Sequence, residues 1–379
     1  MKVVLVGDFP INDKIQTGIE GVLVNLTNEF VDRNEIDLVL VSFSNSIYLD
    51  RYRNKCKIYT LDFRSSILQS RSKFNEIVKK EKPDIIHLQG VVPGILLFNK
   101  KNKNRFIVTQ HAILSKERLQ QVSLKKKIKF YIKEIVERIY LTKVANIVFI
   151  SNYNKEVYLK NRTAPELNYV LIPNPVSKIF DSRSFNEALQ KKNELYFVGE
   201  IKKRKGLYIL LKALSEIKKQ QINFKLHVIG GFKEKEYEKL IMQAVGTLGL
   251  EKNVLFCGWK SQSEILSYTK DIPIFVLPSF QETLPLSVAE AMTQEKLVIA
   301  TDVGGTAEMI SDNVSGFLFP AGDHKTLAAI IKIVLLHPDN HRDMAINAGR
   351  ESVKYRAAAV ADKTLDFYSD IIKSRVNTS

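Results

Sequence analysis

Short apolar runs alternate with helical patterns along the whole chain. In the first half, such runs occupy residues 3–7, 36–41, 58–61, 85–88, 106–108 and 147–150. The pattern starts again at 194–198, where an apolar run leads to a glycine and a long helical pattern. Buried strands that alternate with helices are typical of a doubly wound parallel sheet. A single core rarely grows beyond about 250 residues, and the chain has 379, so we expect an α/β protein with two such domains.

The stretch 277–310 carries the clearest pattern of a binding site. It reads LPSFQETLPLSVAEAMTQEKLVIATDVGGTAEMI. An apolar run ends at Pro278, a polar turn follows, and Pro285 suits the first position of a helix. The N–H groups of Leu286 and Ser287 lack partners within such a helix, and the positive end of the helix dipole lies behind them. This helix start is therefore predicted to bind a phosphate.

Two glutamates flank the predicted helix start. Glu282 lies in the turn before it, and Glu290 lies eight positions later. A carboxylate can accept hydrogen bonds from two hydroxyl groups, so one glutamate could hold a ribose and the other a sugar. A second turn with Asp302, Gly304 and Gly305 predicts a neighbouring phosphate-type turn. The spacing of the two glutamates alone also occurs by chance, so the surrounding residues must decide.

The segments SFQETLPLSVAEAM and TDVGGTAEMI resemble a known enzyme signature. They are similar to the glutamate, seven residues, glutamate signature of the retaining glycosyltransferases of family 4 (group 1), which includes bacterial mannosyltransferases and plant sucrose synthases. The resemblance implies the GT-B fold, in which two Rossmann-like domains face each other across a cleft. It implies that Glu282 contacts the hexose of the donor and Glu290 the ribose of its nucleotide. Leu284, Leu286 and Ser287 are the further donor-binding residues that it implies.

The resemblance covers essentially the whole chain and divides it into two domains. Residues 1–175 would form an N-terminal acceptor-side domain, and residues 176–356 a C-terminal domain that binds the nucleotide sugar. A polar stretch between 176 and 193 predicts the linker. By the same resemblance, a final helical run crosses back onto the first domain, which then also includes residues 357–379.

Glycine turns follow the first strand of both predicted domains. In the first, TGIEG resembles the family's loop with Gly18 as the close-approach position, although an ordinary glycine turn is an equal alternative. In the second, Gly199 precedes IKKRKG, where Lys205 matches the family's lysine but Glu200 stands in place of its arginine. A carboxylate would repel the diphosphate expected there. We therefore predict that Glu200 turns away or pairs with a cation, and that Arg204 joins Lys205.

Polar residues also end two strands of the first domain. His87 and Gln89 end DIIHLQG, and His111 ends FIVTQHA. A lone histidine is more often an ordinary core or surface residue, but functional residues collect at strand ends, and the resemblance implies that His111 points toward the transferred sugar. Ser151 and Asn174 also resemble family positions. Ser151 could equally be a helix N-cap, and Asn174 a turn residue before proline.

The segment 116–143 is the most basic part of the chain. It has nine Lys or Arg and three Glu, a net charge of +6. Its apolar residues fall at helical spacing opposite the charges: Ile128, Tyr131, Ile132, Ile135 and Ile139. One interpretation is a helix packed on the sheet with a solvated basic face. The other is a surface for anionic lipid or for a phosphate-bearing acceptor.

Composition narrows the partners and the compartment. The formal net charge of +16 suits nucleic acid, an anionic membrane or a phosphorylated substrate. Phe130 and Tyr131 are too few aromatic residues for a single-strand binder, so we expect no nucleic acid. Cys56 and Cys257 lack metal-ligand spacing and fit a reducing compartment. The start of the chain shows no cleavable leader and no run of eighteen apolar residues occurs, so we expect a cytoplasmic protein, with peripheral membrane attachment as an option.

The predicted activity is transfer of a hexose from a UDP- or GDP-sugar to a hydroxyl group with retained anomeric configuration. The acceptor would be a glycan or a lipid-linked glycan in the assembly of cell-surface polysaccharide or glycolipid. His111, Lys205 and Glu282 are the predicted catalytic residues. No two aspartates are spaced Asp-x-Asp, so we expect neither metal nor cofactor, with cations and the helix start stabilising the leaving diphosphate.

Two rival functions stay open. A degenerate glycosyltransferase fold could bind a sugar nucleotide or a partner transferase without turnover, and Glu200 is the feature that favours it. A nicotinamide oxidoreductase could also use this fold class, but neither first strand is followed by a clean Gly-x-Gly-x-x-Gly. Release of nucleotide from UDP- and GDP-sugars would separate an enzyme from a binding protein.

Overall fold

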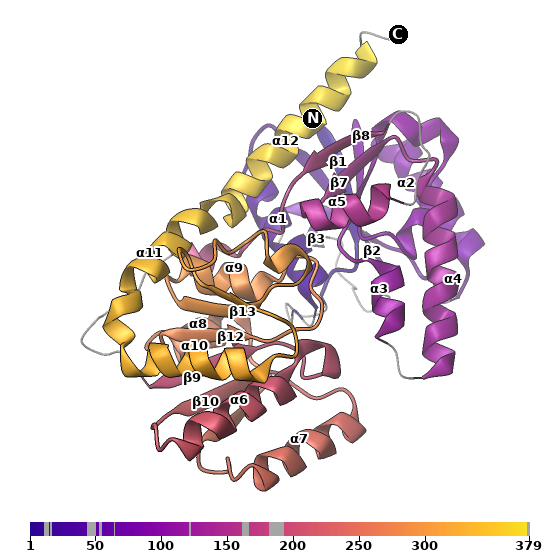
Figure 1. Cartoon of the computed structure of the whole chain (residues 1–379). Coiled ribbons are helices and arrows are strands. Elements are labelled where there is room, and N and C mark those ends of the chain that lie inside the picture. The colour runs from indigo at the N-terminus through magenta and orange to yellow at the C-terminus, as the bar shows by residue number, and fades with distance from the viewer. Residues whose placement is uncertain are drawn as a thin grey trace. The chain divides into compact units, whose positions relative to one another are not determined.

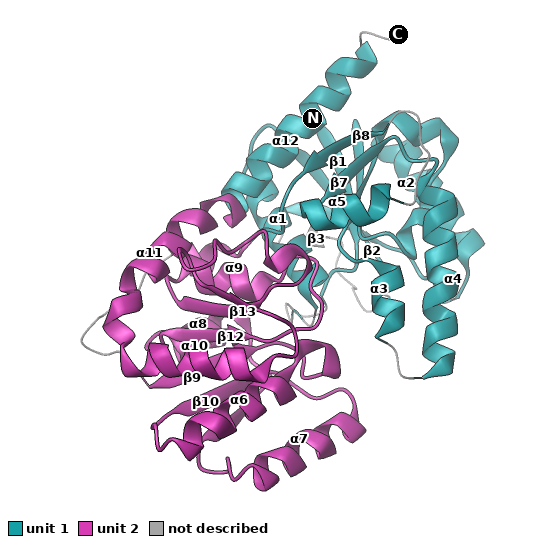
Figure 2. Ribbon diagram, in the orientation of Figure 1, with its two compact units in different colours: residues 1–175, 357–379 teal, residues 176–356 magenta. Residues whose placement is uncertain are grey.

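The chain forms two compact units (Figure 2). The computed structural model describes residues 1–10, 15, 17–43, 51–52, 55–63, 65–120, 123–160, 167–181 and 193–376. Unit 1 consists of Met1–Pro175 and Ala357–Ser379, and unit 2 of Val176–Arg356. Each unit is built on its own sheet with helices between the strands. The α/β class with two doubly wound sheets, predicted from the alternating runs, is confirmed.

The sheet of unit 1 has eight strands among the described residues, in the order β3-β4-β2-β1-β5-β6-β7-β8. The strands are β1 Lys2–Gly7, β2 Asp37–Ser42, β3 Arg51–Tyr52, β4 Cys56–Thr60, β5 Ile85–Gln89, β6 Phe106–Gln110, β7 Asn146–Phe149 and β8 Asn168–Leu171. Each of the six predicted runs forms a strand. Neighbouring strands are parallel except β3, which is antiparallel to β4. This edge strand is too short to leave an apolar run, so the sequence did not predict it.

Helices of unit 1 pack on both faces of this sheet (Figure 1). They are α1 Gly18–Val31, α2 Ile67–Glu81, α3 Leu114–Leu119, α4 Leu124–Leu141, α5 Asn152–Leu159 and α12 Ala357–Val376. One core contains Phe30 of α1 and Tyr368 of α12, and the other contains Phe74 of α2 and Leu141 of α4. Tyr368 is fully buried, which is why the last helix belongs to the same unit as the first strand.

The sheet of unit 2 has six strands within the described ranges, all parallel, in the order β11-β10-β9-β12-β13-β14. The strands are β9 Glu194–Val198, β10 Lys225–Ile229, β11 Val254–Gly258, β12 Ile274–Leu277, β13 Leu297–Thr301 and β14 Phe317–Phe319. The helices are α6 Leu207–Lys219, α7 Lys235–Thr247, α8 Gln262–Thr269, α9 Leu286–Thr293, α10 His324–Leu336 and α11 Arg342–Glu351. The central strands β9 and β12 are neighbours, so the loops that follow them meet at one edge of the sheet.

Two predicted boundaries differ from the structure. Pro285 has extended backbone angles and is the N-cap of α9, not its first helical residue. The predicted linker 176–193 is not free chain where it is described. Val176 N donates a hydrogen bond of 2.7 Å to Tyr355 O, and Phe180 is buried, so residues 176–181 are part of unit 2. Residues 182–192 lie outside the described residues.

Helix α4 turns its apolar residues outward. Figure 1 shows it beside α3, with which it is in contact. The exposed large apolar side chains on α4 are Leu124, Ile128, Tyr131, Ile132, Ile135 and Ile139. The interpretation in which this face packs on the sheet is therefore wrong, because Val136, Tyr140 and Leu141 make the contact with the core instead. Within the described ranges, none of the helices has both the length and the apolar content to span a membrane.

Candidate functional site

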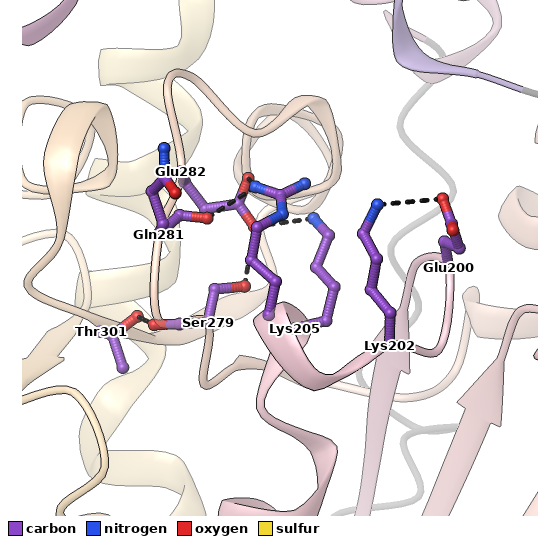
Figure 3. Close-up of polar contacts among 8 residues, drawn as sticks. Glu200, Lys202, Lys205, Ser279, Gln281, Glu282 and Thr301 are labelled. Carbon is purple, nitrogen blue, oxygen red and sulfur yellow. Dashed lines mark hydrogen bonds and ion pairs between the residues drawn. The ribbon is translucent and has the colours of Figure 1, made fainter. Parts of the chain in front are cut away.

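Glu282 is the centre of a buried cluster of charges in unit 2 (Figure 3). It lies in the turn between β12 and α9, and its side chain is only 6% exposed. Lys205 Nζ lies 2.8 Å from its Oε1, and Arg204 Nη1 lies 3.3 Å from its Oε2. Ser279 Oγ donates a further hydrogen bond of 2.7 Å to Oε1. The carboxylate is therefore held by three donors, of which two are cations.

The loop after β9 and the turn after β12 touch, and a glycine makes this contact possible. Arg204 Nη1 donates a hydrogen bond of 2.7 Å to the carbonyl oxygen of Gln281. Gly206 has φ +71°, and a Cβ at this position would lie 1.8 Å from the carbonyl oxygen of Pro278. A residue with a side chain would be strained in this conformation and would collide with the turn. Gly206 therefore lets the cations of one loop reach Glu282 in the other.

The cluster favours an anionic ligand. Burial favours the neutral acid, but the charges of Lys205 and Arg204 outweigh it and hold the pKa of Glu282 below its ordinary value. Burial lowers the pKa of Lys205, and Glu282 opposes that change. Two cations and one carboxylate give the cluster a net charge of +1. In the part of the chain that the structure describes, no group of three His, Cys, Asp or Glu side chains could hold a metal ion.

Glu200, which replaces the expected arginine, is paired with other cations. Its Oε2 lies 3.1 Å from Lys202 Nζ and 3.5 Å from Lys233 Nζ. Burial would raise its pKa, but these lysines outweigh burial and lower it. The dashed contacts in Figure 3 join Glu200 to Lys202 and Glu282 to a separate set of residues. The prediction that Glu200 pairs with a neighbouring cation is confirmed.

Glu290 lies in the second turn of α9, which begins at Leu286. Gln262 Nε2, from α8, donates a hydrogen bond of 3.1 Å to Glu290 Oε1. Burial of the carboxyl group raises the pKa of Glu290 to about 7. The second predicted turn also reaches the first, because Gly305 N donates a hydrogen bond of 3.3 Å to Glu282 O. The two turns and the start of α9 therefore meet at one place.

His111 of unit 1 belongs to a series of buried polar side chains that are joined by hydrogen bonds. Its Nε2 lies 2.8 Å from Gln89 Oε1, and its Nδ1 lies 3.0 Å from Asn174 Oδ1. Gln89 Nε2 in turn lies 3.3 Å from His87 Nε2. Burial lowers the pKa of His111 to about 4, and the hydrogen bond with Asn174 opposes this change. At neutral pH the ring is therefore uncharged, and its two nitrogens are occupied by side-chain amides.

The same series continues through His87 to the last helix. His87 Nδ1 lies 2.5 Å from Tyr368 Oη, and His87 Nε2 lies 2.7 Å from Thr109 Oγ1. Burial, with a smaller contribution from His111, lowers the pKa of His87 to about 3. All of these side chains are buried. A continuous path of neutral hydrogen-bonding groups therefore runs from α12 to His111 inside unit 1.

Gly18 and Ser151 stand at helix starts. Gly18 is the first residue of α1, and its neighbour Thr17 is the N-cap, whose Oγ1 accepts a hydrogen bond of 3.3 Å from Glu20 N. Ser151 is the N-cap of α5 and accepts a hydrogen bond of 3.1 Å from Asn154 N. The ordinary capping role considered for Ser151 is therefore present. Asn174 is more than a turn residue, because it contacts His111.

Most of the chain matches known families and structures. Residues 17–178 match the family described as Glycosyltransferase Family 4, and residues 179–352 match Glycosyl transferases group 1. The fold is similar to that of Anabaena HepE, solved in complex with UDP-glucose, with a TM-score of 0.76 and 18% identity over 97% of this chain and 99% of HepE. The chain belongs to the GT-B glycosyltransferases. The resemblance seen in the 277–310 stretch is thus confirmed at the level of the family and the fold.

Curated relatives of this glycosyltransferase include proteins named for polysaccharide biosynthesis. The capsular polysaccharide biosynthesis glycosyltransferase CapM of Staphylococcus aureus is 25% identical over 367 residues, 91% of this chain and 93% of CapM. The amylovoran biosynthesis glycosyltransferase AmsK of Erwinia amylovora is 32% identical over only 151 residues, which span 38% of this chain and 36% of AmsK. Similarity therefore extends over more than nine tenths of CapM and over about a third of AmsK.

The structure of the glycosyltransferase assembles part of the predicted site and adds residues that the sequence did not single out. Glu282, Lys205 and Arg204 meet directly, whereas His111 belongs to a separate network in the other unit. Ser279 lies only three residues before Glu282, in the same turn, so the sequence offered a signal for it. Gln262 reaches Glu290 from α8, 28 positions earlier, and this contact could not be read from the sequence. Thr109, which the sequence analysis did not single out, could have been identified from its spacing to His111. It is two residues before His111, and residues two apart at a strand end share one face.

Proposed function

We propose that this glycosyltransferase moves a hexose from a UDP- or GDP-sugar to a hydroxyl group of a glycan or lipid-linked glycan, with retention of configuration. The observation that carries the proposal is the buried Glu282 held by Lys205 and Arg204. HepE is solved in complex with UDP-glucose, and CapM and AmsK are named for polysaccharide biosynthesis. We infer a role in the same kind of pathway for this chain.

Glu282 is proposed to bind a hydroxyl group of the transferred hexose. A carboxylate has about four acceptor positions, and three donors already contact Glu282. One position is therefore left for a sugar hydroxyl. Because the carboxylate stays ionised and is fixed by its donors, it can orient the hexose without first reorganising.

Lys205 and Arg204 are proposed to stabilise the leaving diphosphate, together with the N–H groups of Leu286 and Ser287. The net positive charge of the cluster matches the negative charge that develops as the bond to the hexose breaks. The start of α9 adds the positive end of a helix dipole. With these groups in place we propose a metal-independent reaction. Turnover that is abolished by EDTA and restored by Mg²⁺ would contradict this part of the proposal.

Glu290 is proposed to accept hydrogen bonds from the ribose hydroxyls, and Leu284, Gly18 and Gly199 to line the donor site. His111 is proposed to contact the hexose from unit 1 as a neutral imidazole. Its low pKa makes it unsuited to act as a general acid at neutral pH. Its role is then to exchange the hydrogen bond with Gln89 or Asn174 for one with a sugar hydroxyl. The acceptor hydroxyl is proposed to enter on the face from which the diphosphate leaves.

The test is incubation of the full chain with a panel of UDP- and GDP-sugars, with and without a polyhydroxylated acceptor. Released nucleotide identifies the donor, and NMR of the product gives its anomeric configuration. The proposal expects turnover with one donor and an α-linked product from an α-linked donor. Tight nucleotide binding without any release of nucleotide would instead favour the non-catalytic alternative. The pairing of Glu200 with Lys202 and Lys233 removes the feature that had favoured that alternative.

We also propose that α4 attaches this protein to an anionic membrane surface. Its outward apolar side chains are well exposed, for example Leu124 at 71% and Ile132 at 56%. Lys125, Lys126, Lys127 and Lys129 are exposed on the same helix. An apolar stripe flanked by lysines suits the interface of an anionic bilayer. Each basic residue near such a surface contributes about 1 kcal/mol at low salt.

Flotation with phosphatidylcholine vesicles, with and without phosphatidylglycerol, tests this attachment. We expect binding only to the anionic vesicles, with a steep loss as salt is added. Ile132→Asp should weaken it, whereas Ile333→Asp, at an equally exposed position on α10 of unit 2 (52%), should not. Equal binding to both vesicle types, or equal effects of the two substitutions, would contradict the proposal.

A further inference from the structure

Unit 1 contains a pocket of ≈ 200 Å³ that the proposed donor chemistry does not use. The end of β6 and helices α3, α4 and α5 line it. Gln110, the last residue of β6, and Asn154 of α5, the helix after the neighbouring strand β7, both line it. Ligands of α/β proteins bind at the carboxyl ends of such strands. Gln110 precedes His111, so its side chain points to the opposite face of the sheet, and the pocket is distinct from the surroundings of His111.

The pocket has buried polar atoms whose hydrogen-bonding capacity is not used. Asn154 is fully buried, and among the described residues neither its Oδ1 nor its Nδ2 has a hydrogen-bond partner. Gln110 is 3% exposed, and its Oε1 likewise has none there. Leaving buried donors and acceptors unsatisfied is unfavourable. A ligand that offers both donors and acceptors would satisfy these three atoms at once.

Glu137 of α4 adds a carboxyl group to the same pocket. Gln110 Nε2 donates a hydrogen bond of 2.9 Å to Glu137 Oε1. Burial raises the pKa of Glu137 to about 8; Gln110 opposes this rise, and the charges of Glu134 and Glu117 add to it. Near neutral pH the carboxyl group therefore keeps its proton and can donate a hydrogen bond. Arg138 is the basic residue among the lining side chains, so the pocket offers little to a strongly anionic ligand.

Part of the remaining wall is apolar and aromatic, and Ser115, Glu134 and Thr142 add polar groups to it. Ile113, Leu114, Leu141 and Tyr158 line the pocket. With about 30 Å³ for each water of the liquid, a pocket of ≈ 200 Å³ has room for about six or seven waters, close to the bulk of one pyranose ring. A sugar ring presents hydroxyl groups at its rim and C–H groups on its faces. This combination matches amides and a carboxyl group beside aliphatic and aromatic walls.

We propose that this pocket is a carbohydrate subsite, in which the amide of Asn154, the Oε1 of Gln110 and the carboxyl group of Glu137 bind one neutral sugar residue of the acceptor glycan. The assignment to the acceptor rests on the proposed glycosyltransferase function, whereas sugar binding itself does not. The subsite holds a residue away from the reacting hydroxyl group, so it contributes to acceptor affinity and length preference. It does not take part in the bond-forming step.

The first experiment measures sugar binding by the full chain in the absence of nucleotide. Saturation-transfer NMR is recorded with the methyl glycosides of glucose, galactose, mannose and N-acetylglucosamine. We expect a signal from at least one glycoside, lost in Asn154→Ala and in Ser115→Trp, which fills the pocket from a lining position that is only partly buried. Asn152→Ala is the matched control, because Asn152 lies on the same helix but outside the pocket lining. No binding of any glycoside, or binding that Ser115→Trp leaves unchanged, would overturn the subsite and leave a pocket filled only by water.

The second experiment separates this inference from the proposed function. In a transfer assay with an oligosaccharide acceptor, Asn154→Ala should raise the acceptor KM at least about tenfold, a loss of about 1.4 kcal/mol, with the donor KM unchanged. Normal transfer without any dependence on the pocket would refute the subsite and keep the transferase. Pocket-dependent sugar binding without transfer from any donor would keep the subsite as a sugar site and refute the transferase together with the assignment to the acceptor.

Discussion

The cluster around Glu282 and the network around His111 hold their polar side chains in opposite ways. In unit 2, the buried Glu282 stays ionised, and the partly buried Lys205 and Arg204 neutralise it. In unit 1, His111 and His87 are buried as neutral rings, and their hydrogen-bond partners are amides and hydroxyl groups. Charged groups can stay charged inside a protein only when partners offset the loss of hydration. The cluster around Glu282 supplies those partners, whereas the surroundings of His111 and His87 offer only neutral groups.

This difference matches the ligands that we assign to the two units. A diphosphate is a strong anion and requires a site with surplus positive charge, which the ionic cluster offers. Sugar hydroxyl groups are neutral and are recognised by amides, hydroxyl groups and imidazole, which the neutral network offers. The contrast also sets the pH behaviour of each unit, because neutral histidines resist protonation and ion pairs resist neutralisation.

Loss of Lys205 should have the largest effect. Lys205→Ala leaves Glu282 buried with one cation instead of two, so we expect the free energy of unfolding to fall by about 3–5 kcal/mol. Loss of a preorganised charge at the leaving group should lower turnover by about 10²–10³. Lys202→Ala is the matched control, because this lysine pairs with the partly exposed Glu200. Chemical unfolding and nucleotide release measure the two effects. Equal losses in both variants would show that the cluster around Glu282 has no special role.

Acid should weaken the neutral network through His111. Its pKa is about 4 in the folded protein and about 6.5 in an unfolded chain, so the unfolded state binds more protons between these values. Stability from this residue is therefore complete above pH 6.5 and is lost as the pH falls toward 4, by about 3 kcal/mol. In urea unfolding, the advantage of wild type over His111→Asn should shrink by this amount between pH 7 and pH 4. If the free energies of unfolding of wild type and His111→Asn changed with pH in parallel, His111 would not be a buried neutral residue.

Ionisation of Glu290 should control donor affinity. Its pKa is about 7, and protonation turns one of its two acceptor oxygens into a donor, so the carboxylate binds the two ribose hydroxyls more strongly than the acid does. Loss of one hydrogen bond to a charged group costs about 1.5–3 kcal/mol, so Glu290→Gln should weaken UDP-sugar binding at pH 8 by about ten- to a hundredfold. Wild-type affinity should fall between pH 8 and pH 6, and that of the variant should not. Calorimetry at both pH values provides the measurement. The same fall in both proteins would assign the titration to another group.

Much of the ionic cluster could be predicted from the sequence. Glu282 and Lys205 stand beside recognisable turns, and strand order in a doubly wound sheet brings the loops after β9 and β12 together. The contact itself depends on Gly206, whose φ of +71° and close approach to Pro278 O leave no sequence signal beyond the presence of a glycine. Pairing of Glu200 could be predicted from its charge alone, because an unpaired carboxylate at that place would be unfavourable.

The neutral network and the orientation of α4 could not be predicted in the same way. Tyr368 lies 281 positions from His87, and an aromatic residue at helical spacing reads equally well as core. In α4 the helical period showed two faces, one apolar and one charged, but not which of them meets the protein. Core contacts come from Val136, Tyr140 and Leu141, which a pattern centred on the isoleucines does not include. Tertiary packing determines the long-range contacts and which face of α4 meets the core, and local hydrophobic periodicity does not report either of them.

The smallest effect, and the finest test of the neutral network, is coupling across His87. Tyr368→Phe and Thr109→Val each remove one hydroxyl partner from the ring, and each should lower the free energy of unfolding by about 1 kcal/mol. The two hydroxyl groups bind the two nitrogens of one imidazole. If they form a single network, removal of one hydroxyl group changes how much the other contributes to the free energy of unfolding. The double variant should then deviate from additivity by at least about 0.5 kcal/mol. Urea unfolding of the wild type, the two single variants and the double variant measures this coupling. Additivity within about 0.3 kcal/mol would mean that the hydroxyl groups act separately, and that α12 stabilises unit 1 by apolar packing of Tyr368 alone.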